Sequence, residues 1–215
     1  GARMNEAPVW LSTSTRNLQR QIDQELDRLY PNPKVKRDKV VLRKGRENYL
    51  CLLNYEDAVR GIGIPGRAVA LGLMARWIAH TRDGDMSGGD FPSWLSDLVG
   101  IPYTTGLSDR RGECIYAACS HYTRCFVENS VRRARRAGLV VANHALVMIQ
   151  AARGGLGGGE RAARLVFDEG HHVFDAAVSA FSAHITGVEM WALRRLLPGL
   201  DTPAMGRAPG PKARL

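Results

Sequence analysis

Four short apolar runs along the chain predict β-strands, and each of them ends in polar or charged residues. They lie within residues 8–15, 39–46, 139–144 and 164–168. A short apolar run bounded by polar residues is typical of a strand that is buried in a sheet. Residues 52–113 lose this strand character. The pattern therefore predicts an α/β fold in which a long, mainly helical segment separates two groups of strands.

Helices are predicted where apolar residues recur every three or four positions. The clearest case is residues 17–29, where Leu18, Ile22, Leu26 and Leu29 fall on one face. The hydroxyl residues before this helix can cap its backbone N–H groups or hold a phosphate, and capping is the simpler interpretation. Further helices are predicted at residues 68–81, 129–136 and 145–151, and beyond Phe174.

Glycine marks several predicted turns and loops. Residues 61–66 match the pattern GxGxxG, but the run contains Pro65 and no apolar strand leads into it, so we interpret it as a turn. Gly138 is predicted to end the basic helix before it. The glycine-rich residues 154–159 predict a surface loop, and residues 198–215 predict a loop or a cut end.

The chain is basic, with 30 Lys and Arg residues against 21 Asp and Glu and a net charge of +9. This excess favours an anionic partner, most simply a nucleic-acid backbone, although an inert basic surface has the same composition. No apolar run approaches the length that spans a bilayer, and residues 1–8 lack the apolar segment of a signal peptide. We therefore expect a cytoplasmic protein with no membrane partner.

The four cysteines follow the spacing C-x62-C-x4-C-x5-C, with Cys51 far upstream of Cys114, Cys119 and Cys125. Four thiolates can hold an iron–sulfur cluster, with one sulfur on each iron. They can also hold a structural zinc ion, although zinc sites usually draw on two tight CxxC pairs. Disulfides would need an oxidising compartment. The spacing favours the cluster and leaves zinc and unligated core cysteines open.

Two adjacent carboxylates, Asp168 and Glu169, directly follow the last apolar run. If that run is a strand of a parallel sheet, the pair lies at the carboxyl edge, where α/β proteins bind ligands. One carboxylate could there hold Mg²⁺ beside a phosphate while the other orients water. The alternative is a strand that leaves the sheet into solvent through polar residues.

Taken in order, five segments of the chain resemble the iron–sulfur helicases of superfamily 2, the XPD/DinG group, and most of all the bacterial DinG type. Each segment alone is a modest match, but their order along most of the chain makes the resemblance specific. The segments are Ser12–Thr15 with Leu18 and Gln19, Arg43–Cys51, Cys114–Phe126, Val140–Leu146, and Asp168–His171.

The resemblance implies a partial RecA-like parallel sheet of the P-loop NTPase type with an inserted, mainly helical iron–sulfur domain. Residues 1–45 and 131–182 would belong to the first motor domain, and the second range would continue it to motif II. Residues 46–130 would form the insert around the cluster. Residues 183–215 would begin the arch domain or form a truncated tail.

The resemblance also implies a role for each matching residue. The residues that would contact the DNA backbone, as motif Ia, are Ser12, Thr13, Thr15 and Gln19. The ligands of a [4Fe–4S] cluster would be Cys51, Cys114, Cys119 and Cys125. Asp168 would hold the Mg²⁺ of Mg-ATP and Glu169 would polarise the attacking water. His171 would link the state of ATP to the DNA-contacting motifs.

The implied activity is that of an ATP-dependent DNA helicase in repair or replication, which moves 5′ to 3′ on single-stranded DNA and acts on forked or gapped DNA. The chain departs from the family in two respects: Gly170 stands where Ala is common, and no GxxxxGK[ST] loop occurs in it. We therefore expect a piece of a helicase that does not hydrolyse ATP alone. The alternative is a non-catalytic nucleic-acid-binding module with a structural zinc or iron–sulfur site.

Overall fold

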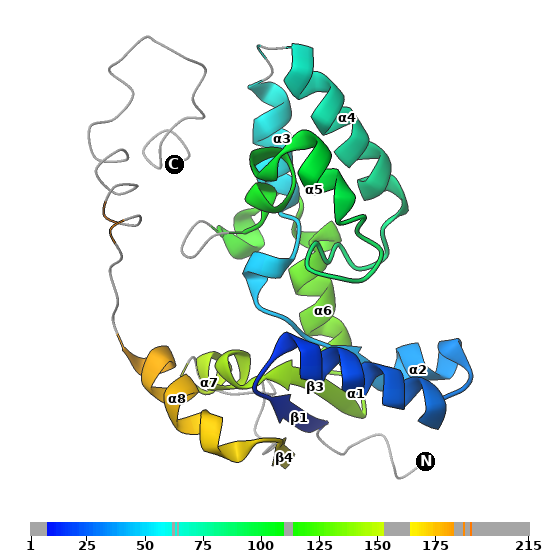
Figure 1. The fold of residues 1–215 in the computed structure, drawn as a ribbon, viewed down its shortest axis with the longest axis vertical. Helices are drawn as coiled ribbons and strands as arrows, with labels where there is room; N and C mark the ends of the chain where they lie inside the picture. Colours follow the sequence, from blue (N-terminus) through cyan, green and yellow to red (C-terminus); the bar gives the residue numbers. More distant parts are fainter. Residues whose placement is uncertain are drawn as a thin grey trace. The chain divides into compact units, whose positions relative to one another are not determined.

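The structure is a computed structural model that describes residues 8–61, 63, 65–109, 114–152, 164–182, 187 and 190 (Figure 1). The chain divides into two compact units. The first lies within residues 1–49 and 114–182, and the second lies within residues 50–113 and 183–215. The glycine-rich run at 154–159 and the tail at 198–215 lie outside the described residues.

The first unit is built on a four-stranded parallel sheet, which confirms the predicted α/β fold class. Its strands are β1 (Val9–Thr13), β2 (Val40–Leu42), β3 (Leu139–Asn143) and β4 (Arg164–Phe167). Their order across the sheet is β2-β3-β1-β4, so β3 lies between the two strands that precede it in sequence. Trp10 of β1 is paired with Val140 of β3 and with Leu165 of β4.

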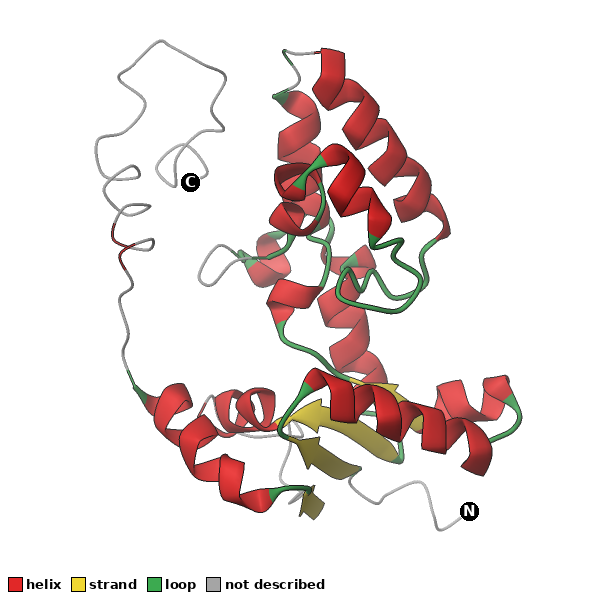
Figure 2. Ribbon diagram, viewed as in Figure 1, coloured by secondary structure: helices red, strands yellow, loops and turns green. Residues whose placement is uncertain are grey.

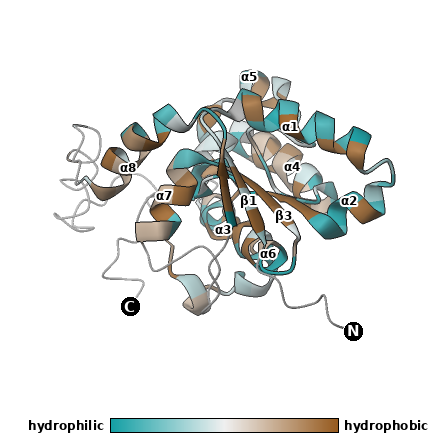
Figure 3. Cartoon of the chain, turned by 90° about the horizontal axis from the view of Figure 1, so that it is seen from below, coloured by the Kyte–Doolittle hydropathy of each residue, from teal (hydrophilic) through white to brown (hydrophobic). Residues whose placement is uncertain are grey.

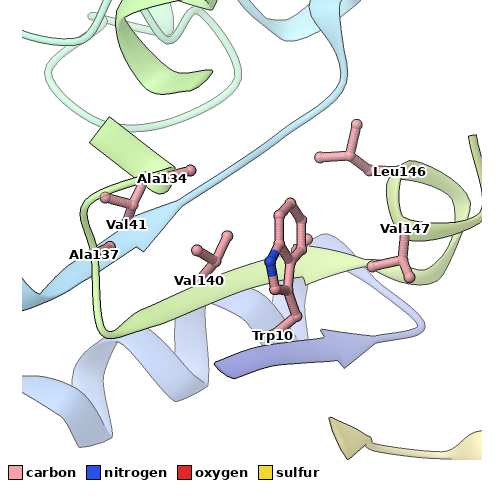
Figure 4. Packing of buried hydrophobic residues seen from close by; sticks show 8 residues of the cluster. Trp10, Val41, Ala134, Ala137, Val140, Leu146 and Val147 are labelled. Carbon is pink, nitrogen blue, oxygen red and sulfur yellow. The ribbon is translucent and has the colours of Figure 1, made fainter. Parts of the chain in front are cut away.

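Helices pack on both faces of this sheet. On one face, Trp10, Val140 and Val147 belong to a buried cluster that includes residues of α6 (Phe126–Ala134) and α7 (His144–Ala152) (Figure 4). On the other face, Leu26 of α1 (Arg16–Leu29) packs with Val40 and Val141. Figure 3 shows the hydrophobic character of β1 and β3 in brown. The alternation of apolar side chains along these strands thus anchors a helix layer on each side.

Local capping explains where the first two helices begin. Thr15 accepts a hydrogen bond from the Leu18 N–H of α1 at 3.3 Å. Asn32 accepts one from the Lys34 N–H of α2 (Pro33–Lys39) at 3.0 Å, and Pro33 occupies the first turn. The periodicity predicts that Leu29 shares the buried face of α1, but its side chain is 72% exposed because α1 ends there.

The remaining elements of the first unit are short. They are η1 (Arg46–Asn48), η4 (Tyr116–Ala118), η5 (Tyr122–Arg124), η6 (Gly170–His172) and α8 (Val173–Phe181). The prediction that Gly138 ends the basic helix is wrong, because α6 ends earlier, at Ala134. Gly138 instead pairs with the start of β1, because its carbonyl accepts a hydrogen bond from the Val9 N–H at 3.0 Å.

The second unit is mainly helical in its described part (Figure 2). It contains α3 (Leu52–Arg60), α4 (Pro65–His80), α5 (Trp94–Val99), η2 (Ile101–Tyr103) and η3 (Thr105–Leu107). Gly61 caps the end of α3 and Pro65 begins α4, so the GxGxxG run connects two helices. Across the described residues of both units, no helix has the length and apolar character that a membrane span needs.

Lys36 links α2 to α1. Its ammonium lies 2.6 Å from Asp23 Oδ1 and 2.7 Å from Asp27 Oδ1, and it also donates to the Asp23 carbonyl at 2.9 Å. Burial disfavours the charge, but the two carboxylates outweigh this effect and raise the pKa of Lys36. A raised pKa in the folded state means that the stabilisation is complete below the ordinary value of 10.5 and is lost as pH rises through the raised value.

Lys36→Met is therefore expected to lower the free energy of unfolding by about 1 kcal/mol at neutral pH. The matched control is Lys34→Met on the same helix, because the Lys34 side chain is exposed. Urea unfolding at neutral pH measures the loss of unfolding free energy in each variant, and the same measurement in strongly alkaline buffer shows whether the loss disappears. An equal loss in the two variants, or a Lys36→Met effect that persists in alkali, would contradict this role.

Candidate functional site

Three strands bring polar groups to the carboxyl edge of the sheet. Because β1, β3 and β4 are parallel, Ser12, His144 and Asp168 meet at the ends of strands that lie side by side. The Asp168 N–H donates to the Ser12 carbonyl at 2.8 Å, which extends the β1–β4 ladder by one bond. This edge is where open parallel sheets bind ligands.

His144 is the most buried ionisable group at this edge, with 2% of its surface exposed. Its Nδ1 lies 2.7 Å from the Ser12 hydroxyl, and its ring packs 5.8 Å from the ring of Phe167. Burial lowers the pKa of His144, while the backbone of Asp168 and Glu169 opposes the shift. The imidazole is therefore neutral at neutral pH.

The acidic pair, Asp168 and Glu169, follows β4 directly, and the backbone turns sharply at Glu169. Glu169 has a left-handed backbone with φ 54° and ψ 50°, a conformation that costs a non-glycine residue about 1 kcal/mol. Its Oε2 lies 3.4 Å from the His171 Nδ1, and both side chains are exposed. A Cβ added at Gly170 would lie 4.0 Å from the Phe167 Cβ, an ordinary contact, so alanine would also fit there.

The residues predicted to contact DNA differ in exposure. Ser12 and Thr13 are fully buried, and Gln19 is 1% exposed, whereas Thr15 is exposed at the start of α1. The Thr13 hydroxyl donates to the Thr15 carbonyl at 3.1 Å. The Ser12 and Thr13 hydroxyls are thus already engaged inside the protein. Their contact with DNA stays a prediction.

The four cysteines form no disulfide, and each is half-buried. Cys51 lies in the second unit as the residue that precedes α3, where its N–H donates to the Leu107 carbonyl at 3.0 Å. Cys114, Cys119 and Cys125 belong to the first unit. Among the described residues, no three or more His, Cys, Asp or Glu side chains gather in an arrangement that could hold a metal ion.

Two of the sulfurs in the first unit sit among backbone N–H groups. Cys114 Sγ accepts the Tyr116 N–H at 3.4 Å. Burial raises the pKa of the Cys125 thiol, the N–H groups of Glu128 and Val127 oppose this shift, and nearby Cys114 adds to it. Hydrogen bonds to sulfur of this kind also surround cysteine ligands of iron–sulfur clusters.

Arg46, five residues before Cys51, contacts the cysteine-rich segment, which we define as residues 114–125, and the helix that follows it. Its guanidinium lies 4.8 Å from the centre of the Tyr116 ring and 3.4 Å from Glu128 Oε1 of α6. Tyr116 has a left-handed backbone with φ 49° and needs such support, because this conformation is unfavourable for residues other than glycine. Arg46 therefore helps to fix the backbone between Cys114 and Cys119.

Comparison with characterised proteins gives relatives along most of the chain. ATP-dependent helicase DinG of Mycobacterium tuberculosis is 31% identical over 222 residues, which cover 94% of this chain and 32% of the relative. ATP-dependent DNA helicase YoaA of Haemophilus influenzae is 30% identical over 191 residues, 85% of this chain and 29% of the relative. YoaA of Escherichia coli is 32% identical over 161 residues, 73% of this chain and 24% of the relative.

The chain belongs to the DinG-like helicases. No protein-family model matches it. The chain spans about a third of the length of the curated relatives DinG and YoaA named above.

In this DinG-like sequence, no motif predicts a role for His144. Its partner Ser12 lies 132 positions away, so no local pattern could have paired them. The signal that was available is the position itself: a polar residue directly after an apolar strand, as in the case of Asp168. Side chains in that position meet at one edge only when the strands are parallel neighbours.

Arg46→Gln is expected to weaken the cysteine-rich segment of this DinG-like chain by about 1 kcal/mol, because it removes both the cation–π contact and the ion pair. Local opening of the segment should then be about fivefold more frequent. The measurement is the labelling rate of Cys114 and Cys125 by a thiol reagent in the metal-free chain.

Cys51 serves as an internal reference for this experiment because it lies in the other unit. Arg60→Gln is the matched variant, since Arg60 pairs with Glu56 within α3. Equal acceleration at Cys51 would indicate general destabilisation and would contradict a local role for Arg46.

Proposed function

We propose that this chain is part of an ATP-dependent DNA helicase of the DinG type, and that its sheet is a partial RecA-like motor domain. The observation that carries the proposal is the position of Asp168 and Glu169 directly after a parallel strand, with Asp168 hydrogen-bonded to β1. Two carboxylates at that edge suit a nucleotide-bound Mg²⁺. The names of the relatives support the same activity.

In this proposal the exposed edge residues divide the phosphoryl-transfer chemistry among them. Asp168 would hold the Mg²⁺ of Mg-ATP, and Glu169 would orient and polarise the attacking water. His171, which faces Glu169, would report the state of the nucleotide to the DNA-contacting segments. The chain contains no GxxxxGK[ST] loop to cradle the phosphates, so we propose that this sequence alone hydrolyses no ATP.

We propose further that Cys51, Cys114, Cys119 and Cys125 together hold a [4Fe–4S] cluster. The number and chemistry of the donors support this proposal: four thiols match the four irons of such a cluster, each is half-buried, and N–H groups face the sulfurs of Cys114 and Cys125. Such a cluster would supply structural rigidity, because phosphoryl transfer requires no electron. Residues 46–130 would then form the inserted domain between the motor segments 1–45 and 131–182, and residues 183–215 would begin an arch domain.

The DNA substrate in this proposal is a single strand, followed 5′ to 3′, at forked or gapped sites that arise in repair or replication. The net charge of +9 supports binding to a phosphate backbone. Thr15 is the exposed member of the motif that begins α1, and Ser12, Thr13 and Gln19 would support it from within. The inserted domain would act as a wedge beside the strand.

Glu169→Gln in the full-length protein is expected to lower the kcat of ATP hydrolysis about 100-fold or more, because an amide cannot polarise the attacking water. Binding of ATP should change little, since the substitution preserves size. Steady-state hydrolysis and nucleotide binding measure the two effects. Asp175→Asn, in the first turn of α8, is the control. Undiminished hydrolysis in Glu169→Gln would refute the assigned role.

Cys114→Ser is expected to abolish the brown absorbance of the cluster and DNA unwinding, while ATP hydrolysis of the full-length protein falls by less than about threefold. Iron and acid-labile sulfide, measured on anaerobically purified protein, distinguish a cluster from zinc. Ser120→Ala is the matched control within the same segment. Normal unwinding by a variant that lacks the cluster would remove the wedge role.

A further inference from the structure

The structure leaves one buried polar atom at the sheet edge that the proposed mechanism does not use. His144 Nε2 is buried and has no hydrogen-bond partner among the described residues. Its other ring nitrogen is engaged by Ser12. A buried polar atom without a partner costs about 1–3 kcal/mol, so its position needs a reason beyond packing.

The His144 ring lies where the ends of three strands meet. Ser12 belongs to β1, His144 begins α7 directly after β3, and Phe167 ends β4, so the ring lies among three neighbouring strand ends. Ser12 is also bonded to the acidic loop through its own carbonyl, which accepts the Asp168 N–H. Ser12 therefore contacts the imidazole with its side chain and the acidic loop with its backbone.

The ring is in contact with the segment that leads into the acidic pair. A neutral imidazole has one donor and one acceptor nitrogen, and a hydroxyl can donate or accept, so Ser12 can pair with Nδ1 in either tautomer. The other side of this connection is Phe167, the residue before Asp168, whose ring lies 5.8 Å from the imidazole.

We propose that His144, held by Ser12, is a positioning residue that fixes the backbone of Asp168 and Glu169 for phosphoryl transfer. The inference rests on the proposed function, because it concerns the same acidic pair. His144 touches neither nucleotide nor metal in this role. It acts through Ser12, whose carbonyl accepts the Asp168 N–H, and through its contact with the Phe167 ring. Glu169, the next residue after Asp168, has a left-handed backbone that neighbouring groups must hold.

A double-mutant cycle in the full-length protein tests this pairing. Ser12→Ala removes the hydroxyl, and His144→Phe keeps a ring against Phe167 but removes both nitrogens. Each single variant is expected to lower the kcat of DNA-stimulated ATP hydrolysis about tenfold, with the KM for ATP changed less than about twofold. The kcat of the double variant should fall no further than that of either single variant, because each substitution alone already breaks the same contact.

Two further variants separate positioning from stability. His144→Asn places an amide near the position of Nδ1, so it can still form a hydrogen bond with the Ser12 hydroxyl and should recover kcat to within about threefold of wild type. Ser130→Ala removes another buried hydroxyl, which donates to the Val127 carbonyl at 2.7 Å within α6. It should lower the melting temperature without changing kcat.

The outcomes distinguish this inference from the function on which it rests. A wild-type protein without DNA-stimulated ATP hydrolysis would refute both. If the wild type is stimulated but the two single losses multiply to about 100-fold in the double variant, only the positioning role is wrong. The positioning role is equally wrong if the kcat losses track the melting temperature across all variants, including Ser130→Ala. Non-additive losses with rescue by His144→Asn support the role.

Discussion

The parallel pairing of β1 with both β3 and β4 is the constraint on which the candidate site depends. It makes three segments that are distant in sequence end at one edge of the sheet. The register cannot slip by one residue, because a slip would turn Trp10 and Val140 out of the buried cluster. Ser12 is therefore paired with Ala142 on one side and Phe167 on the other, which brings the polar strand ends together.

Much of this fold follows from the sequence, because short apolar runs mark its strands. The runs at 8–15, 139–144 and 164–168 contain β1, β3 and β4. The prediction that each run is buried is wrong for β4, which lies at the edge of the sheet with all four of its residues exposed. Helix limits are harder to predict. The sequence pattern places a helix at 129–136, whereas α6 spans Phe126–Ala134. Its start gives no signal in the sequence, because the residue before it is Cys125, which makes no side-chain capping hydrogen bond. The helix α2 escapes prediction, because its residues are mostly charged and none is buried.

The site is only partly visible in the sequence. The position of Asp168 and Glu169 after an apolar run can be anticipated, since a strand end is a local feature. The contact between Ser12 and His144 cannot, because it depends on the strand order. Backbone strain is equally hidden: among the described non-glycine residues, positive φ occurs only at Tyr116 and Glu169, and neither residue type signals it. Both lie in the segments to which the chemistry is assigned.

The place of β3 between β1 and β2 has a consequence for biosynthesis. Val9 pairs with Leu139, about 130 positions downstream, so the central ladder of the sheet cannot close while that stretch is still being made. At ribosomal speeds of about 5–20 residues per second, β1 waits on the order of ten seconds for its partner. During that interval its apolar side is available to chaperones or to other nascent chains. The second unit, by contrast, takes its described helices from one continuous stretch and can form while β1 is still waiting.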